Sequence, residues 1–317
     1  MSLGLIISSV ELGGVYAVMA LGIYITYKIL DFPDLTVDGS FPLGSAIAAA
    51  MLTRGCNVFL TMAAAAAAGV VAGLLTGVIH VKFKVRDLLS GIILMTALYS
   101  VNNMISSGKA NVNLTRDKTT VFSNDFVTSL FGGKNDTSAP LYFLRDYRKI
   151  IILAIILIVL KIALDFFMSS KRGYLLRAMG DNPKVVATLA RNGGNIKIMG
   201  LMIANGFVAL SGALYCQYIS AFNLTDGTGK MVIGLASVII GVNIFGRLRF
   251  LKSTTAVIIG SVVYTACVSI ALNRFDASVK NLVTAVLFFV VLVLGQLEIK
   301  KRTKPQTGEI LSKGEGK

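Results

Sequence analysis

The sequence has few of the residues that hydrolytic and metal chemistry require. His80 is its only histidine, and its three cysteines, Cys56, Cys216 and Cys267, lie far apart. An odd and scattered set of cysteines gives neither a disulfide framework nor the Cys/His spacing of a metal site. The sequence therefore predicts no catalytic residue, no metal ligand and no cofactor bound by this chain.

Charged residues are also scarce, at 15% of 317 residues, whereas hydrophobic residues make up 55% and the mean hydropathy is +0.74. Soluble domains average about 25% charged residues. Apolar runs of about 20 residues recur, which predicts an all-α polytopic membrane protein with about nine transmembrane helices in the lipid bilayer. Lys and Arg cluster between these runs, so the net charge of +15 indicates membrane orientation and no nucleic-acid partner.

Two of the predicted spans are short and interrupted by glycine. Asp38-Gly39 and Pro42 break the second span, and Gly227 and Gly229 precede the seventh. Interrupted spans at corresponding places in the two halves of a chain are typical of transporters with an internal repeat. In these transporters the substrate route lies at the interface between the repeats. The predicted spans are about Leu3–Tyr27, Phe41–Leu52, Asn57–His80, Leu88–Ile105, Ile150–Phe167, Ile196–Ala221, Met231–Phe245, Thr254–Ala271 and Leu282–Leu297. In the third, Gly69, Gly73 and Gly77 predict close helix packing.

We expect residues 1–298 to form one transmembrane domain and residues 299–317 a flexible tail. A polar loop at about 107–148 is predicted to hold a short helix near Asn124–Phe131. Basic residues flank alternate connections, and those with the most Lys and Arg are predicted to be cytoplasmic. That orientation places the N-terminus and Lys230 outside, and the C-terminus and the basic loop at about 169–195 in the cytoplasm.

The basic loop predicts a short amphipathic helix outside the hydrocarbon. Asp181 or Asn182 can cap its start, and Pro183 suits its first turn. Val185, Val186 and Leu189 recur on one face, and Gly193-Gly194 predicts its end. About ten residues cannot cross a bilayer. We interpret this helix as the docking site of a motor subunit.

Polar residues within the spans are candidates for a substrate route. They are Glu11, Asp38, Gly39, Ser40, Asn102 and Asn205. Interhelical hydrogen bonding is the structural alternative for each. Tyr16, Tyr24, Tyr99 and Tyr215 can form an apolar site or pack between helices. Lys161 and Asp165 are spaced as an ion pair on one helix face. Leu224 and Met231 stand where a phosphate-binding loop requires Gly and Ser/Thr, so no ATP site is predicted.

Several blocks in order resemble the membrane permeases of bacterial ATP-driven importers. They are DLTVDGSFPLG, GIILMTALYSVN, RGYLLRAMGDNP, ALSGALYCQY and GLASVIIGVNIFG. The chain is similar to the branched-chain amino acid and ribose permease family, and most similar to its tryptophan/tyrosine transport branch. The resemblance implies a homodimeric type II-like permease in the bacterial cell membrane. It also implies two cytoplasmic ATPase subunits that hold ATP and Mg, and an extracytoplasmic substrate-binding protein.

Within that resemblance, the family's R-A-x-G-x-N-P block carries the coupling helix. The matching residues here are Arg177, Ala178, Gly180, Asn182 and Pro183. The implied cargo is an aromatic or branched-chain amino acid. A simple sugar or nucleoside carried by the same machinery is an alternative, and an ion-coupled secondary transporter is another, although Glu11 is the only carboxylate that suggests ion coupling.

The predicted topology can be tested by cysteine labelling in cells. Lys134→Cys should react with an impermeant maleimide from outside, whereas Lys313→Cys should react only after the cells are opened, because the two positions are separated by an odd number of spans. Labelling of both positions from the same side would show that the topology is wrong.

Overall fold

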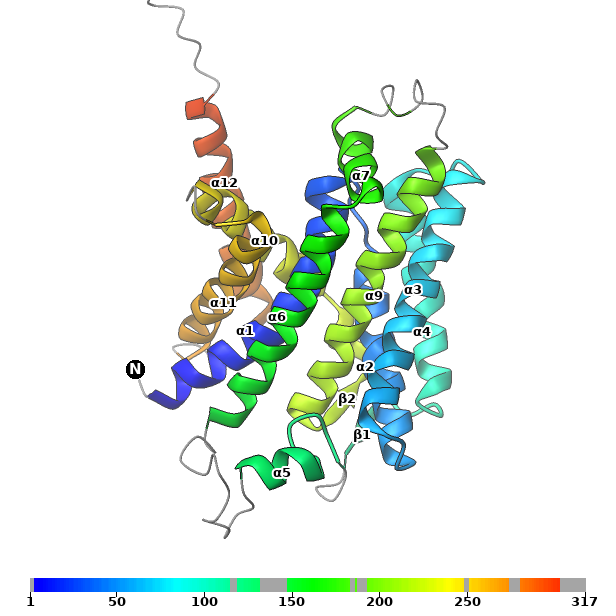
Figure 1. Cartoon of the computed structure of the whole chain (residues 1–317), viewed down its shortest axis with the longest axis vertical. Helices are drawn as coiled ribbons and strands as arrows, with labels where there is room; N and C mark the ends of the chain where they lie inside the picture. The colour runs from blue at the N-terminus through cyan, green and yellow to red at the C-terminus, as the bar shows by residue number, and fades with distance from the viewer. Residues whose placement is uncertain are drawn as a thin grey trace, which may run out of the picture.

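The computed structural model describes residues 3–114, 119–131, 147–182, 186, 193–247, 251–273 and 280–302, and it places a helix in each predicted span (Figure 1). The helices are α1 (Leu3–Ile23, continued by the π-helical η1, Tyr24–Ile29), α2 (Val37–Thr53), α3 (Val58–Val81), α4 (Asp87–Ile105), α6 (Arg148–Met168), α9 (Gly193–Ile219), α10 (Lys230–Ile244), α11 (Ser253–Leu272) and α12 (Lys280–Arg302). Among the described residues, seven segments are long and apolar enough to cross a membrane, and the number nine is therefore approximate. The two shorter ones are α2, with 17 residues, and the apolar part of α12, Leu282–Val293.

The connecting segments form small elements at the two ends of the bundle. At one end, β1 (Asn111–Asn113) pairs antiparallel with β2 (Ala221–Asn223), and α5 (Asp125–Phe131) confirms the short helix predicted in the polar loop. At the other end lies α7 (Lys171–Asp181) (Figure 1). We call these the α5 end and the α7 end. Two 3₁₀ turns, η3 (Leu224–Gly227) and η4 (Phe245–Arg247), flank α10.

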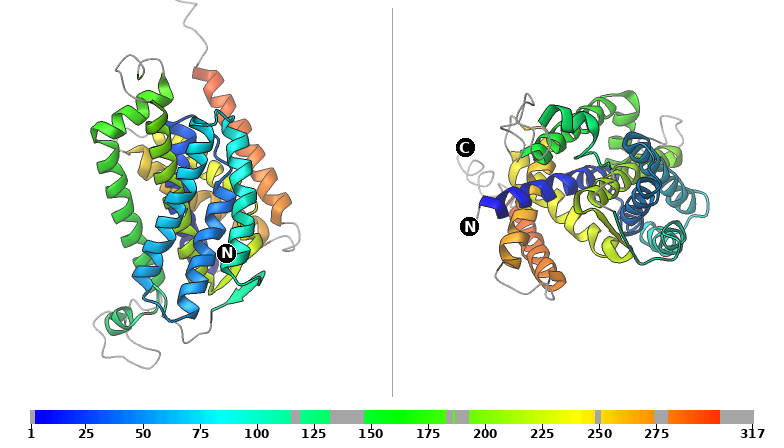
Figure 2. Two further views of the ribbon diagram at one scale, coloured as in Figure 1. Left: turned by 90° about the vertical axis from the view of Figure 1, so that its right-hand side faces the viewer. Right: turned by 90° about the horizontal axis from the view of Figure 1, so that it is seen from below.

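The long helix α9 is the centre of one half of the bundle, where it packs against α3 and α2. Small residues allow this contact. A side chain at Gly69 or Gly73 of α3 would overlap the backbone carbonyl of Asn205 or Leu201, and Gly77 lies against Ile198. The predicted glycine stripe is therefore confirmed as a close helix contact. On the other side, α10 and α12 pack with α11, and α1 contacts both halves. The right-hand view of Figure 2 shows α1 running between them.

Two helices begin inside the bundle instead of at its ends. After η1, residues 30–36 run inward without forming a helix, and we call them the inward segment. The first turn of α2 follows, and its Ser40 contacts Asn205 near the middle of α9. From the α5 end, β2 and η3 lead to Gly229, whose φ of 77° turns the chain into α10 at the level of Tyr16. These are the two segments whose interruption the sequence predicts. Lys230 is buried at this depth, so its predicted place in an outer connection is wrong.

Close contact between α2 and α9 makes a specific stability prediction. A methyl group at Gly44 would overlap the carbonyl oxygen of Ala209, whereas one at Gly4 of α1 would meet nothing. We expect Gly44→Ala to destabilise the protein by about 1–3 kcal/mol, as overpacking does. Gly4→Ala should be neutral or slightly stabilising, because alanine favours helix. Thermal unfolding of both variants in detergent checks this, and equal stability would contradict the packing.

Candidate functional site

Asp38 joins the two helices that begin inside the bundle. It lies in the first turn of α2, and its two carboxylate oxygens accept hydrogen bonds from the backbone of α10. Gly229 N donates to Oδ2 at 3.1 Å and Met231 N donates to Oδ1 at 2.7 Å. The first backbone N–H groups of a helix have no intrahelical partner and carry a partial positive charge. The Asp38 carboxylate thus satisfies the start of α10 where lipid offers no alternative.

Lys230 places a positive charge beside this carboxylate. Its side chain is 4% exposed, and its Nζ donates to Tyr16 Oη at 2.7 Å. The ammonium lies 4.5 Å from the ring centres of Tyr16 and Tyr215 and 4.9 Å from that of Phe41. Cation–π contacts of this kind are worth about 2 kcal/mol or more when they are desolvated. The structure therefore brings Tyr16 and Tyr215 together around a cation from the chain itself.

A chain of buried hydrogen bonds connects the inward segment to α9. Asn205 Nδ2 donates to Asp34 Oδ2 at 2.7 Å, and Ser40 Oγ donates to Asn205 Oδ1 at 2.7 Å. Thr36 N donates to Asp34 Oδ1 at 2.9 Å, and the Thr36 hydroxyl pairs with that of Thr76 at 2.9 Å. We call these five residues the polar seam. Because polar groups buried in a membrane protein must find partners, the seam holds the start of α2 in position.

The remaining route candidates divide into two groups. We call the place where Asp38 of α2 meets the start of α10 the junction. Asn102 of α4 lies next to it, because its Nδ2 donates to Gly39 O at 3.1 Å. Glu11 lies nearer the α5 end, where it accepts a hydrogen bond from Tyr218 Oη at 3.1 Å. Asp34 was missed by the sequence analysis, which treated its segment as a connection between spans. The signal was present as a third carboxylate within the run DFPDLTVDG.

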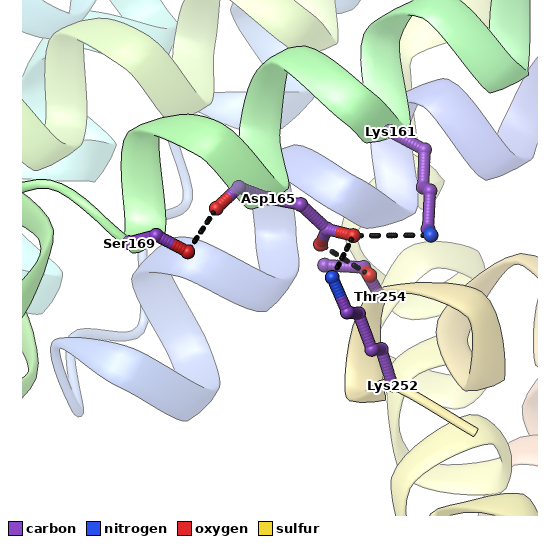
Figure 3. Close-up of polar contacts among 5 residues, drawn as sticks. All are labelled: Lys161, Asp165, Ser169, Lys252 and Thr254. Carbon is purple, nitrogen blue, oxygen red and sulfur yellow. Dashed lines mark hydrogen bonds and ion pairs between the residues drawn. The ribbon is translucent and has the colours of Figure 1, made fainter. Parts of the chain in front are cut away.

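Near the α7 end, Asp165 connects α6 to the start of α11 (Figure 3). Its Oδ2 lies 3.0 Å from Lys161 Nζ and 3.3 Å from Lys252 Nζ, and its Oδ1 accepts from Thr254 Oγ1 at 2.7 Å. The predicted Lys161–Asp165 pair is confirmed. Asp165, Lys252 and Thr254 line a cavity of about 320 Å³ together with Arg177 of α7. Arg177, which the sequence predicts to be a coupling residue, thus lies beside the point where α6 and α11 meet.

The structure changes the boundaries expected for the coupling segment. Residues Lys171–Asp181 form α7, so Asp181 ends a helix, and Asn182 follows with extended backbone. The helix predicted to start there lies outside the described residues apart from Val186, which is helical. Gly193 and Gly194 begin α9, although they were predicted as a helix end. Val186 is fully buried in the main core, so in this conformation it is not available to a partner. The other stripe residues and the first-turn proline, Val185, Leu189 and Pro183, lie outside the described residues.

Within α7, one face is attached to the bundle. Gly180 lies against the carbonyl of Ile29, the last residue of η1, and Leu176 is fully buried next to Gly200 of α9. A side chain at position 180 would overlap that carbonyl, so glycine is required for the contact. Ala178 is half-buried, whereas Arg177 is exposed. The geometry leaves the basic side of α7 open and connects its other side to the segment that leads to Asp34.

Comparison with known proteins identifies relatives over nearly the whole chain. A family model described as "Branched-chain amino acid transport system / permease component" matches residues 5–293. A tyrosine transport system permease protein of Clostridioides difficile (strain R20291) is 39% identical over 93% of this chain and 92% of its own length. An uncharacterized protein of Rickettsia prowazekii (strain Madrid E) is 29% identical over 92% of this chain and 97% of its own. The ribose import permease of Escherichia coli (strain K12) is 25% identical over 72% of this chain and 65% of its own. No solved structure matches significantly.

The junction can be tested by neutralising Asp38. Asp38→Asn keeps the shape but removes the charge that stabilises the start of α10 and attracts Lys230, and a charged hydrogen bond contributes about 1.5–3 kcal/mol. We expect a loss of stability of about that size. Asp87→Asn is the matched control, because Asp87 is likewise a half-buried acidic residue in the first turn of a helix, α4. An equal decrease in the thermal unfolding temperature of the two variants would contradict a special role for Asp38.

Proposed function

The chain belongs to the family of permease components of branched-chain amino acid transport systems, and on that premise we propose that it forms the membrane route of an ATP-driven importer for an aromatic or branched-chain amino acid. The tyrosine permease of C. difficile supports this cargo because its similarity extends over 93% of the chain. A simple sugar is the second candidate, supported by the more distant ribose permease.

In this proposal the α7 end faces the cytoplasm of a bacterial cell, and the N-terminus and the α5 end face outward. The concentration of Lys and Arg near α7 and the start of α11 supports the orientation through the positive-inside rule. A substrate-binding protein would deliver cargo at the α5 end. The permease itself contributes no chemistry, and ATP and Mg would be bound by two partner ATPase subunits.

The contact of α7 with η1 supports a mechanical connection between the ATPases and the route. An ATPase that moves α7 would displace Gly180, and with it the Ile29 carbonyl at the end of η1. The residues after Ile29 form the inward segment, in which Asp34 contacts Asn205 and so belongs to the polar seam. Movement at the surface would therefore reach the starts of α2 and α10, where alternating access requires a change. The contact between Gly180 and Ile29 is therefore the main support for the proposed function.

Two permease copies would complete the machine. The chain contributes one α7 segment, whereas a paired ATPase engine needs two docking sites, and a homodimer supplies them by symmetry. The mass of the complex purified from membranes should correspond to two identical permeases and two ATPases.

A charge reversal on the exposed side of α7 tests coupling. We expect Arg177→Glu to reduce both co-purification of the ATPase and ATP-dependent uptake at least tenfold, because reversing an interface charge creates like-charge repulsion. The control is Lys109→Glu, which reverses an exposed charge near the α5 end. Uptake that survives Arg177→Glu, or that depends on an ion gradient instead of ATP, would contradict the proposal.

A further inference from the structure

The cavity of about 320 Å³ at the α7 end is lined by more cationic than anionic side chains. Arg177 and Lys252 are its cations, whereas Asp165 is the one carboxylate among the described residues that line it. Lys161, which pairs with the same carboxylate, adds a further positive charge beside the cavity (Figure 3). Small-molecule sites in proteins have volumes of about 300 Å³ and more. The size and the charge balance of this cavity therefore favour an anionic ligand.

The carboxylate in this cavity is already paired. Asp165 Oδ2 faces the ammonium groups of Lys161 and Lys252, and its Oδ1 accepts from the Thr254 hydroxyl at 2.7 Å. The Ser169 hydroxyl donates to the backbone carbonyl of Asp165 at 2.9 Å, so its hydrogen is used as well. Asp165 is therefore compensated by the chain itself, and it does not require a cation from outside.

Several donors in the cavity, in contrast, remain available. The Arg177 guanidinium forms no hydrogen bond or ion pair with any described residue. Lys252 forms a single ion pair, to Asp165 Oδ2 at 3.3 Å, and an ammonium has further N–H donors. Tyr24 and Ser253 line the same cavity, and their hydroxyls have no partner within the described part of the chain. A guanidinium, an ammonium and free hydroxyls together complement a phosphate group.

The position of the cavity indicates the source of the phosphate. It lies where α6 and α11, both long and apolar enough to cross a membrane, reach the α7 end. One face of α6 continues from Ser169 at a spacing of three or four residues, and its apolar side chains are 57–80% exposed: Phe166, Ile162, Ile158 and Ile155. A phospholipid has the matching arrangement of a phosphate above apolar chains, and basic pockets between transmembrane helices bind anionic headgroups.

We propose that this cavity binds the headgroup phosphate of an anionic phospholipid. Arg177 and Lys252 would contact the phosphate, and the acyl chains would lie along the exposed face of α6. A zwitterionic lipid fits less well, because its own positive group would meet these two cations. The lipid would join α7 to the start of α11, since Arg177 lies in α7 and Lys252 caps α11. The site depends on the membrane location of the chain and is independent of the proposed cargo.

Titration of the purified permease with lipids, followed by native mass spectrometry, tests the site. We expect phosphatidylglycerol to bind more tightly than phosphatidylcholine with the same acyl chains. Lys252→Gln and Arg177→Gln should each weaken phosphatidylglycerol binding about tenfold, because loss of a hydrogen bond between charged groups has that effect. Lys161→Gln is the matched control, since it also removes an ion pair of Asp165 but Lys161 does not line the cavity. Its affinity should stay close to that of wild type, and Lys252→Arg should retain binding.

Four results would overturn the inference, and none of them depends on ATP-dependent uptake. Equal affinity for the two lipids would show that the headgroup is not recognised. Equal weakening by Lys161→Gln and Lys252→Gln would show that Asp165, and not the cavity, controls binding. Displacement of the lipid by equimolar inorganic phosphate would identify a site for free phosphate. Unchanged lipid binding by Arg177→Gln and Lys252→Gln, with loss of ATPase co-purification, would assign the cavity to the docking surface of the ATPase.

Discussion

The central constraint on this chain is that a helix start buried inside a bundle of membrane-spanning helices must find partners for its backbone N–H groups. Neither lipid nor the preceding backbone can provide them. Asp38 resolves this for α10 by accepting from Gly229 and Met231, and it does so from the first turn of α2. One carboxylate therefore fixes the meeting point of two helices that run toward opposite ends of the bundle.

The rest of the packing keeps that meeting point in place. Glycines of α3 and α2 bring both helices against α9, so that Asn205 can reach the inward segment and Ser40 at once. Lys230, which lies beside Asp38 in the fold, is held by Tyr16 Oη and by three aromatic rings. A buried ammonium held in this way keeps its partners only while α1, α2, α9 and α10 remain together. The route proposed above would therefore have to exchange these contacts for others as it opens.

Much of this arrangement could be predicted from the sequence. The predictions that were wrong have a common cause. Apolar runs predicted the helices, the spacing of Gly69, Gly73 and Gly77 predicted a close contact, and Asp38 and Asn102 were identified as intramembrane polar groups. The depth at which a short helix begins was not readable, because it is set by tertiary contacts such as Ser40 with Asn205. For this reason Lys230 was assigned to the surface and Asp34 to a connection. The coupling segment was predicted from its basic composition, and the helix predicted after Asn182 lies outside the described residues apart from Val186, which is helical. The helix α7, which Ser170 caps, was not predicted.

The depth of the junction in the bilayer decides whether α2 and α10 begin inside the membrane. A structure of the permease in lipid nanodiscs by electron cryomicroscopy would measure it directly, with the bilayer density as the ruler. We expect the first turns of α2 and α10 to lie near the middle of the bilayer, with the Asp38 carboxylate facing the N–H groups of Gly229 and Met231. An α2 that crosses the whole bilayer, or an α10 that begins at the outer surface, would contradict it.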